Sequence, residues 1–546
     1  MPYRTVDHDE RAEAPVDQGI VGDVVAQFAD PLAFYRELIQ NSIDAGTPSI
    51  EVRLAYDEPA RLMRVTVRDR GDGMSREIVE DQLLVLFRST KEHDETKIGK
   101  FGIGFKSVLA PRPNLVIVQT ARQGQRLTLH LHPDLTYELY DAGPAAQSGT
   151  SVELELAMEP DLSDDFIERT EAALVRWCRH ASVPIELEAR RRSGDEVAVR
   201  IDRPLALEHA LVEVRDAADD GKLVCVVGLV TGTPAVGFFN HGLMLHETEE
   251  PLFGGVAAKI QDSRLGHTLS RDNVRRDDRY TRAVSHARAL IDQALIPAVT
   301  RELAVRAQLA DLRPYYELVN AIERAKLELP ADAWVFPLVS EHRATTRATI
   351  RASELQRRAW GAAHPSPLTA VLAARGTPVL HLSPASQAWL QARVARSAHA
   401  HVASVNEELT AVAPVTLADT DHALLDLLSE LLEGAYRRPP SIGLAKLTGA
   451  CADQLVIADR VGDSIATPDP VFVLDQASAL RNPFGKLLRL PLVLSVTHPT
   501  VVTARAGDPR VAASHLARAI LLHYGKLDVA RSTQLLALTL DRLGVA

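Results

Sequence analysis

Apolar and polar residues alternate in two short stretches near the start of the chain, Ile50–Tyr56 and Leu62–Asp69. A period of two residues is typical of β-strands that bury one face. The stretches that predict further strands in the next hundred residues are Leu115–Thr120, Arg126–His132, Thr136–Tyr140 and Thr150–Leu156. The first part of the chain is therefore expected to contain a sheet.

A helix is predicted between Asp30 and Gly46, ahead of the first strand. Aspartate followed by proline is typical of a helix start, and glycine suits the left-handed residue after a helix end. Glu37, Asn41 and Asp44 recur at i, i+4 and i+7, so they share one face while apolar neighbours anchor the helix. Taken alone, this face also fits an acidic surface exposed to water.

The second strand leads directly into the turn Asp69–Met74, which contains two glycines. Glycine lets the backbone turn sharply and approach a ligand closely, and Asp69 is left at the strand end with a free carboxylate. Gly149 and Thr150 open a later strand, where a hydroxyl and a closely approaching backbone fit a nucleotide pocket. A plain acidic turn is the alternative at Asp69.

A polar, charged segment, Arg88–Lys97, follows a helix predicted from Ser75 to Phe87 and is a candidate lid. It leads into the glycine-rich stretch Gly99–Ser107, which precedes another predicted helix. Backbone N–H groups at such a helix start bind anions, so a phosphate chain is the expected ligand. The stretch is not a Walker A loop, because Phe105 separates the last glycine from lysine and serine.

Composition narrows the class of protein. The 546 residues predict two to four domains, and a net charge of −11 argues against a duplex-binding protein that depends on phosphate neutralisation, although a local basic groove stays open. Three widely spaced cysteines suggest neither a disulfide framework nor a thiolate zinc site. The polar start of the chain and the lack of a long apolar run predict a cytoplasmic protein outside the membrane.

Four motifs occur in order: the helix with Glu37, Asn41 and Asp44, the turn Asp69-x-Gly-x-Gly, the loop Gly-x-x-Gly102-x-Gly and the pair at Thr150. Together they resemble the GHKL ATPase superfamily, which includes gyrase, MutL, histidine kinases and heat shock protein 90 chaperones. The resemblance implies that ATP and Mg²⁺ are bound. It also implies ATP hydrolysis to ADP and phosphate.

The resemblance implies a role for each residue that matches these motifs. Glu37 would act as general base on the attacking water, Asn41 would bind Mg²⁺, and Asp44 would orient the site. Asp69 would accept a hydrogen bond from the adenine 6-amino group. The other residues expected to bind the nucleotide are Gly73, Met74, Lys91, Gly102, Gly104 and Thr150.

Two later stretches resemble the heat shock protein 90 branch in particular, Asp164–Leu187 and Phe253–Asp272. The second matches the chaperone loop whose arginine reaches the ATP γ-phosphate, which makes Arg271 the second expected catalytic residue. The sequence departs from the family pattern at Thr268, where the chaperones have asparagine, and at Arg275, where they have glutamine. Surface ion pairs with neighbouring aspartates are the alternative role for these arginines.

The expected fold is a multidomain α/β protein with an N-terminal GHKL (Bergerat) α/β sandwich at residues 1–160. An α/β middle transducer domain with the catalytic arginine is expected at 161–310, and a mixed α/β C-terminal region at 311–546. Within that region, periodicity predicts helices at Pro384–Arg396 and Asp419–Tyr436 and strands at Val471–Leu474 and Leu487–Val496. A terminal helix, Val511–Tyr524, would serve either dimerisation or core packing.

The leading functional hypothesis is a chaperone ATPase of the heat shock protein 90 type, an ATP-gated homodimeric clamp that remodels protein clients. The alternative is a GHKL switch subunit of a larger assembly that acts on nucleic acid in DNA repair or antiviral defence. A third possibility is a degenerate member that binds nucleotide without turnover, which the changes at Thr268 and Arg275 would explain and the intact Glu37 opposes.

Overall fold

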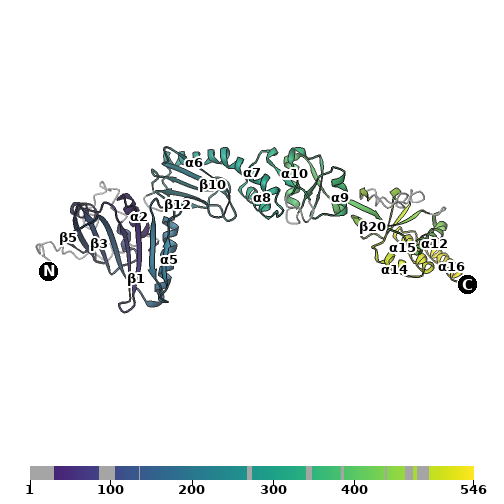
Figure 1. Ribbon diagram of the computed structural model, residues 1–546, viewed down its shortest axis with the longest axis horizontal. Coiled ribbons are helices and arrows are strands. Elements are labelled where there is room, and N and C mark those ends of the chain that lie inside the picture. The colour runs from purple at the N-terminus through teal and green to yellow at the C-terminus, as the bar shows by residue number, and fades with distance from the viewer. Residues whose placement is uncertain are drawn as a thin grey trace. The chain divides into compact units, whose positions relative to one another are not determined.

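The structure is a computed structural model and describes residues 30–84, 105–134, 136–266, 268, 273–339, 347–382, 387–436, 440–461, 471–475 and 491–545. The chain forms two compact units (Figure 1). The first comprises residues up to 298 together with 321–327. The second comprises 299–320 and 328–546.

An eight-stranded sheet forms the centre of the first half of unit 1, in the order β5-β4-β3-β6-β2-β1-β7-β8. Its strands are β1 Ile50–Asp57, β2 Leu62–Asp69, β3 Leu115–Arg122, β4 Gln125–Leu131, β5 Tyr137–Pro144, β6 Gly149–Ala157, β7 Ile185–Arg190 and β8 Glu196–Arg200. The six strands predicted from alternation are therefore confirmed as β1 to β6. All neighbours pair antiparallel except β1 and β7.

Buried and exposed residues alternate along these strands as expected, because only one face of the sheet is covered. In β1, Ile50, Val52 and Leu54 are buried, whereas Arg53 between them is exposed. The covered face packs against two helices, α2 Phe34–Asp44 and α5 Ser163–Cys178 (Figure 1). The result is a two-layer α/β sandwich, which confirms the expected fold class.

The sheet continues past residue 160, the expected end of the first domain. After α5 the chain returns as β7, which pairs in parallel with β1 so that Ile50 lies opposite Ile185. β7 and β8 form a hairpin through the charged turn at Arg191–Asp195. The last strand of this sheet, β8, ends at Arg200, about forty residues after the expected domain end.

Helix α2 begins three residues later than the sequence pattern predicts, at Phe34 rather than Pro31. Asp30 does accept a hydrogen bond from the Leu32 N–H at 2.9 Å, but residues 31–33 form turns and the regular helix starts at Phe34. Its end is as predicted, since Gly46 has a φ of 71°. Tyr35 fixes the helix to α5 because its hydroxyl lies 3.1 Å from the Thr170 hydroxyl.

A second sheet completes unit 1, in the order β12-β11-β13-β10-β9. Its strands are β9 Ala210–Ala218, β10 Leu223–Val230, β11 Val236–Asn240, β12 Leu243–Thr248 and β13 Ala257–Asp262. Every residue of β10 is buried, because helix α6 (Asp278–Leu290) covers one face and an apolar cluster around Leu205 and Phe239 covers the other. The apolar residues of β10 accordingly form a continuous run and do not alternate with polar residues.

Unit 2 begins with most of helices α7 and α8 and contains two further sheets with three or more strands. A parallel sheet has the order β17-β16-β18, and a mixed sheet has the order β21-β23-β20-β19-β22. Its helices are α7 Ile296–Ala307, α8 Arg313–Ala325 (whose last turn belongs to unit 1), α9 Pro367–Ala374, α10 Gln387–Ala398, α11 Val405–Glu408, α12 Asp419–Tyr436, α14 Pro499–Ala506, α15 Pro509–His523 and α16 Val529–Leu543. Its strands are β14 Val335–Pro337, β15 Thr349–Arg351, β16 Arg358–Ala362, β17 Val379–His381, β18 His401–Ser404, β19 Leu409–Pro414, β20 Ile442–Gly449, β21 Val456–Ala458, β22 Phe472–Asp475 and β23 Leu492–Ser495.

The elements predicted in this region are confirmed within the described residues. Helices occur at α10 and α12, and strands occur at β22 and β23. Helix α15 buries Ala513, Leu516 and Ile520 against α12, so its apolar face is packed core. None of the helices in the described part of the chain is long and apolar enough to cross a membrane.

Candidate functional site

The face of α2 predicted to carry chemistry holds three side chains in different environments. Glu37 is buried with 8% exposure, whereas Asn41 and Asp44 are exposed. Asp44 accepts a hydrogen bond from Gln40 at 3.2 Å, and Asn41 makes no side-chain hydrogen bond to the described residues. The helix thus presents one shielded carboxylate beside two polar groups that face water.

Arg36 holds the Glu37 carboxylate. The Arg36 Nη2 lies 3.2 Å from Glu37 Oε1, and both side chains are about nine-tenths buried. The Arg36 guanidinium also lies over the Trp177 ring of α5, 4.9 Å from its centroid. Packing against the indole keeps the guanidinium in place, so the carboxylate of Glu37 has a fixed cationic partner.

Asp69, at the end of β2, is held by three donors from three segments. Its Oδ1 accepts the N–H groups of Gly71 at 2.8 Å and Thr150 at 3.1 Å, and its Oδ2 accepts the Ser42 hydroxyl at 3.1 Å. Ser42 belongs to α2 and Thr150 to β6, so this one carboxylate joins the helix, the glycine turn and a strand. Oδ2 has a lone pair left for another donor.

Burial raises the pKa of the Asp69 carboxyl above its usual value, although its hydrogen bonds to Gly71, Thr150 and Ser42 act in the opposite direction. A carboxylate loses hydration when it is buried, and the three donors replace part of it. An added N–H donor from a ligand would favour the ionised form further.

Two glycines near Asp69, one in the turn and one at the start of β6, lie where no side chain fits. A Cβ added to Gly73 would stand 2.0 Å from the Ala121 carbonyl oxygen, and Gly73 has a φ of 66°. A Cβ on Gly149 would stand 2.5 Å from the Asp69 carbonyl oxygen, again at positive φ. The backbone of the turn is therefore pressed against β3 and β6, as the two-glycine pattern predicts.

Thr120 links Met74 to Thr150. The Thr120 hydroxyl accepts the Met74 N–H at 2.8 Å and lies 3.1 Å from the Thr150 hydroxyl. Met74 is half-buried, and its side chain packs against the main core of the first sheet. Met74 and Thr150, which are far apart in sequence, therefore lie within one hydrogen-bonded group.

Four of the predicted site residues, Lys91, Gly102, Gly104 and Arg271, lie outside the described residues, as does the candidate lid at Arg88–Lys97. The short helix expected after the glycine-rich stretch is present at Phe105–Leu109. Lys106, on this helix, is half-buried, and burial lowers the pKa of its amino group.

The loop after β13 is described at its two ends. Thr268 donates its N–H to the Asn273 carbonyl oxygen at 2.9 Å, and Arg275 donates its N–H to the Gly266 carbonyl at 2.8 Å. The Arg275 guanidinium pairs with Asp277 at 3.0 Å. The ion pair with a neighbouring aspartate, considered as the alternative for Arg275, is present.

The sequence pattern did not single out Ser42, Thr120 or Arg36. Ser42 and Arg36 adjoin Asn41 and Glu37 along the helix, so adjacency to predicted residues is the only signal they carry. Thr120 lies at the end of a predicted strand, and its role depends on the pairing of β3 with β6, which a single sequence does not reveal.

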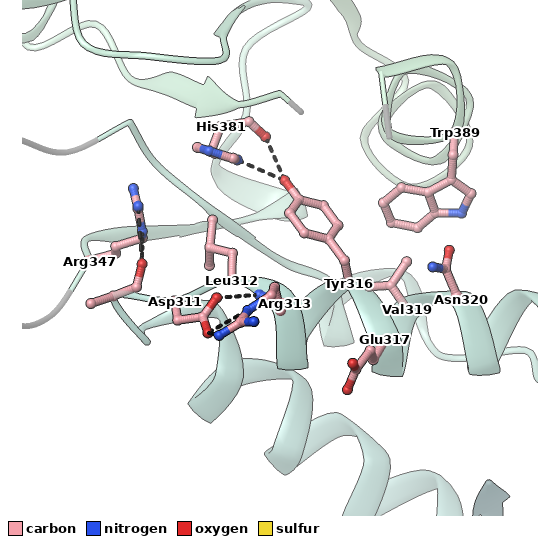
Figure 2. A pocket seen from close by; sticks show the side chains of 11 residues that line it. Asp311, Leu312, Arg313, Tyr316, Glu317, Val319, Asn320, Arg347, His381 and Trp389 are labelled. Atoms are coloured by element: carbon pink, nitrogen blue, oxygen red, sulfur yellow. Dashed lines mark hydrogen bonds and ion pairs between the residues drawn. The ribbon is translucent and has the colours of Figure 1, made fainter. Parts of the chain in front are cut away.

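A separate cavity of about 610 Å³ lies in unit 2 (Figure 2). The Tyr316 hydroxyl points at His381, 2.8 Å from Nδ1, while Trp389 and Asn320 lie on the other side of the Tyr316 ring. Burial and the charge of Arg347 lower the pKa of His381 to about 4. The imidazole is thus neutral near pH 7.

The structure does not support a metal site built from histidines or carboxylates. Within the described residues, no group of three or more His, Cys, Asp or Glu side chains is placed to hold an ion. The amide oxygen of Asn41, exposed and without a side-chain partner among the described residues, fits a Mg²⁺ ion that takes its other ligands from phosphate and water.

Comparison with known proteins agrees with this geometry. Residues 35–142 match the family described as "Histidine kinase-, DNA gyrase B-, and HSP90-like ATPase". The match covers most of α2, the Asp69 turn and the first strands, but ends before β6, which supplies the Thr150 N–H to Asp69.

Similar proteins include three that are named "Chaperone protein HtpG". The protein from Methylococcus capsulatus is 26% identical over 276 residues, which is 44% of this chain and 40% of the relative. The protein from Enterobacter sp. is 28% identical over 199 residues, 30% of this chain and 31% of the relative. The protein from Burkholderia lata is 30% identical over 177 residues, 29% of this chain and 27% of the relative. The matches thus span less than half of the length of these relatives.

Proposed function

Since the N-terminal region of this chain is that of a GHKL ATPase close to HtpG, we propose that the protein binds ATP and hydrolyses it to ADP and phosphate. The observation that carries the proposal is the Asp69 carboxylate, which Ser42, Gly71 and Thr150 hold in one orientation. Its remaining lone pair would accept the adenine 6-amino group. Guanine has an acceptor at that position and would be rejected.

Glu37 would activate the attacking water. It lies on a rigid helix, one turn before Asn41, so a water near Asn41 is within reach of its carboxylate. The pair with Arg36 would have to loosen before the carboxylate takes a proton, because the guanidinium occupies one of its oxygens. Asn41 would hold Mg²⁺, which neutralises phosphate charge when bound.

Asp44, Gly73, Met74 and Thr150 would complete the nucleotide pocket. Lys91, Gly102 and Gly104 would bind the phosphates, and Arg271 would act as a second catalytic residue by compensating charge on the γ-phosphate. These roles rest on the motif resemblance. The tight packing of Gly73 and the Thr120 hydrogen bonds support the roles of Gly73, Met74 and Thr150.

We also propose that the protein is a cytoplasmic, homodimeric chaperone that acts on protein clients. Large apolar side chains that stay exposed on α16 support an interface between two copies. Val529 is 84% exposed, Leu536 50% and Leu540 39%. Their spacing of seven and four residues places them on one side of the helix.

The test is a pair of assays on the full chain, an equilibrium titration with ATP and a steady-state measurement of phosphate release. Glu37→Ala should leave ATP affinity within about threefold of wild type and lower turnover at least a hundredfold, because only the proton transfer is removed. Asp69→Asn should weaken ATP binding by about ten- to a hundredfold. An Arg271→Ala variant should keep binding and lose turnover.

Failure to bind ATP and failure to release phosphate would refute different parts of the proposal. Wild type that binds ATP without releasing phosphate would refute the hydrolysis proposal and leave a nucleotide-dependent switch. Wild type that does not bind ATP would refute the whole proposal. Suppression of aggregation of a model client that Glu37→Ala abolishes would support the chaperone role, whereas ATP-dependent, salt-sensitive DNA binding would contradict it.

A further inference from the structure

A basic cavity of about 410 Å³ lies in unit 1, away from the Asp69 site, where residues 200–205 pass over one face of the second sheet. Its charged and polar wall is formed by Arg200, Asp202, Arg203, Arg215, Gln261 and His180. Arg200 ends β8 of the first sheet and Asp202 and Arg203 follow it, whereas Arg215 and Gln261 belong to β9 and β13 of the second. The cavity therefore lies at the seam between the two sheets of this unit.

The register of the second sheet explains why its positive charges gather on this face. Val226 of β10 lies opposite both Lys259 of β13 and Arg215 of β9. Directly opposed residues project to the same face of a sheet, so Lys259 and Arg215 share one face, and Gln261 follows two residues after Lys259. Leu205 packs on this face beside Val226.

Two guanidinium groups in this wall have no carboxylate partner among the residues that the structure describes. Within that part of the chain, the side chains of Arg203 and Arg215 form no hydrogen bond or ion pair, and both line the cavity and are exposed. Arg200 differs, because it binds both oxygens of Asp202 at about 3.1 and 2.8 Å. The Asp202 carboxylate also accepts the Ile185 N–H, so its charge is already compensated.

A buried lysine that contacts His180, one of the lining residues, adds to the positive potential near the cavity. Lys259 is only 4% exposed, and its Nζ lies 2.9 Å from His180 Nε2 and 2.7 Å from Glu208 Oε1. The same Glu208 carboxylate also pairs with Arg179. One carboxylate thus faces two cations. Burial and the charge of Lys259 lower the pKa of His180 to about 4, which keeps its ring neutral.

We propose that this cavity binds a small oxyanion of the phosphate type, held by the guanidinium groups of Arg203 and Arg215 with the Gln261 amide as a neutral donor. Planar guanidinium groups match the geometry of phosphate oxygens and gain most where no carboxylate competes. The cavity is larger than a free phosphate ion. The ligand is therefore either the ion itself or the phosphate group of a small metabolite.

The test is isothermal titration of the full-length protein with inorganic phosphate and, separately, with glycerol 3-phosphate at constant ionic strength. In Arg203→Gln/Arg215→Gln the dissociation constant should rise at least tenfold, since two charge-assisted hydrogen bonds are lost. The matched control is Arg301→Gln/Arg375→Gln, which removes two exposed arginines of unit 2 whose side chains have no partner among the described residues. It should bind as wild type does.

The ATP site is present in all three proteins, so only the difference between variants is assigned to the cavity. ATP titration of the Arg203/Arg215 variant should be unchanged, and failure of wild type to bind ATP would leave this inference untouched. Phosphate should also raise the pKa of His180 in wild type, followed by its imidazole NMR signals, because an added negative charge favours the protonated ring.

Tighter binding of glycerol 3-phosphate than of phosphate would identify a metabolite as the ligand, and the reverse order would identify the ion. Equal affinity of wild type and the Arg203/Arg215 variant for both ligands would overturn the proposal. An equal loss in the control variant, which would indicate only general attraction of anions, would overturn it as well.

Discussion

At the scale of single residues, the Asp69 carboxylate connects structure to function. We expect Asp69→Asn to weaken ATP binding by about ten- to a hundredfold, because an amide offers one acceptor where the carboxylate offers two and places a donor beside the adenine amino group. Ser42→Ala removes one of its three supports and should weaken binding less than tenfold. Equilibrium titration with ATP measures both.

The order of these two effects matters more than their sizes. If Ser42→Ala weakened binding as much as Asp69→Asn, the hydroxyl rather than the carboxylate would be the group that contacts the base. Circular dichroism should show both variants folded, since each substitution nearly preserves the side-chain volume.

The lowered pKa of His180 should make the stability of unit 1 depend on pH. The pKa of His180 is about 4 in the folded protein, below its usual value of 6.5. Between pH 4 and pH 6.5 the unfolded chain therefore binds more protons at this residue than the folded chain does. Stability is therefore fully present above pH 6.5 and falls as the pH drops to 4, by up to about 3 kcal/mol for this residue.

Denaturant unfolding at pH 7 and pH 4.5 measures this effect. His180→Gln should lose less stability between the two values than wild type does. His381 shifts in the same direction in unit 2 and is present in both proteins, so it cancels in the comparison. An identical pH slope in the two proteins would contradict the assignment to His180.

Sequence alone predicts the residues whose chemistry depends on local pattern. Glu37, Asn41 and Asp69 follow from helical spacing and from a glycine turn after a strand. Ser42 and Thr120 do not, because each becomes functional only through a partner 27 and 30 residues away in sequence. The pairing of Arg36 with Trp177 escapes prediction for the same reason, since it requires α5 to lie beside α2.

At the scale of elements, the turn after β2 leaves no room for a side chain at Gly73. Gly73→Ala should destabilise the protein by about 3 kcal/mol or more, since its Cβ would stand 2.0 Å from a backbone carbonyl oxygen and neither strand can move freely. Thermal unfolding monitored by circular dichroism measures the loss.

Gly124→Ala is the matched control. Gly124 also has a positive φ, 83°, but nothing lies within 4 Å of the position of an added Cβ. Only the backbone preference is lost there, which costs about 1 kcal/mol. Equal destabilisation by the two substitutions would show that the close approach at Gly73 is relieved by a shift of the turn.

The elements that the sequence predicts well are those with a strong local period. The bounds of α12 agree with the predicted helix Asp419–Tyr436, and β1 to β6 follow from alternation. The start of α2 was misplaced, because Asp30 caps a turn rather than the helix itself. The pairing of β7 with β1 has no local signal, so the extent of the first sheet was not foreseen.

At the scale of the whole molecule, the exposed apolar side of α16 should decide the oligomeric state. Leu536→Glu/Leu540→Glu should convert a dimer to a monomer, because two charges per copy would be buried in the interface. Light scattering after size-exclusion chromatography measures the mass.

Val305→Glu on α7 provides the control, since this valine is at least as exposed, at 57%, but belongs to another helix. It should leave the mass unchanged. A wild-type protein that is monomeric at micromolar concentration, with or without ATP, would refute the proposed clamp. A dimer that persists in the Leu536/Leu540 variant would place the interface elsewhere.

The parallel pair of β1 and β7 has a consequence for how the chain is made. Arg53 and Glu188, which bridge the two strands, are 135 residues apart in sequence. At ordinary rates of translation the ribosome needs roughly 7 to 27 s to synthesise that length. During this interval one edge of β1 has no partner and can pair with other chains. A protein proposed to protect other chains from aggregation would thus itself need protection on the ribosome until its second hundred residues emerge.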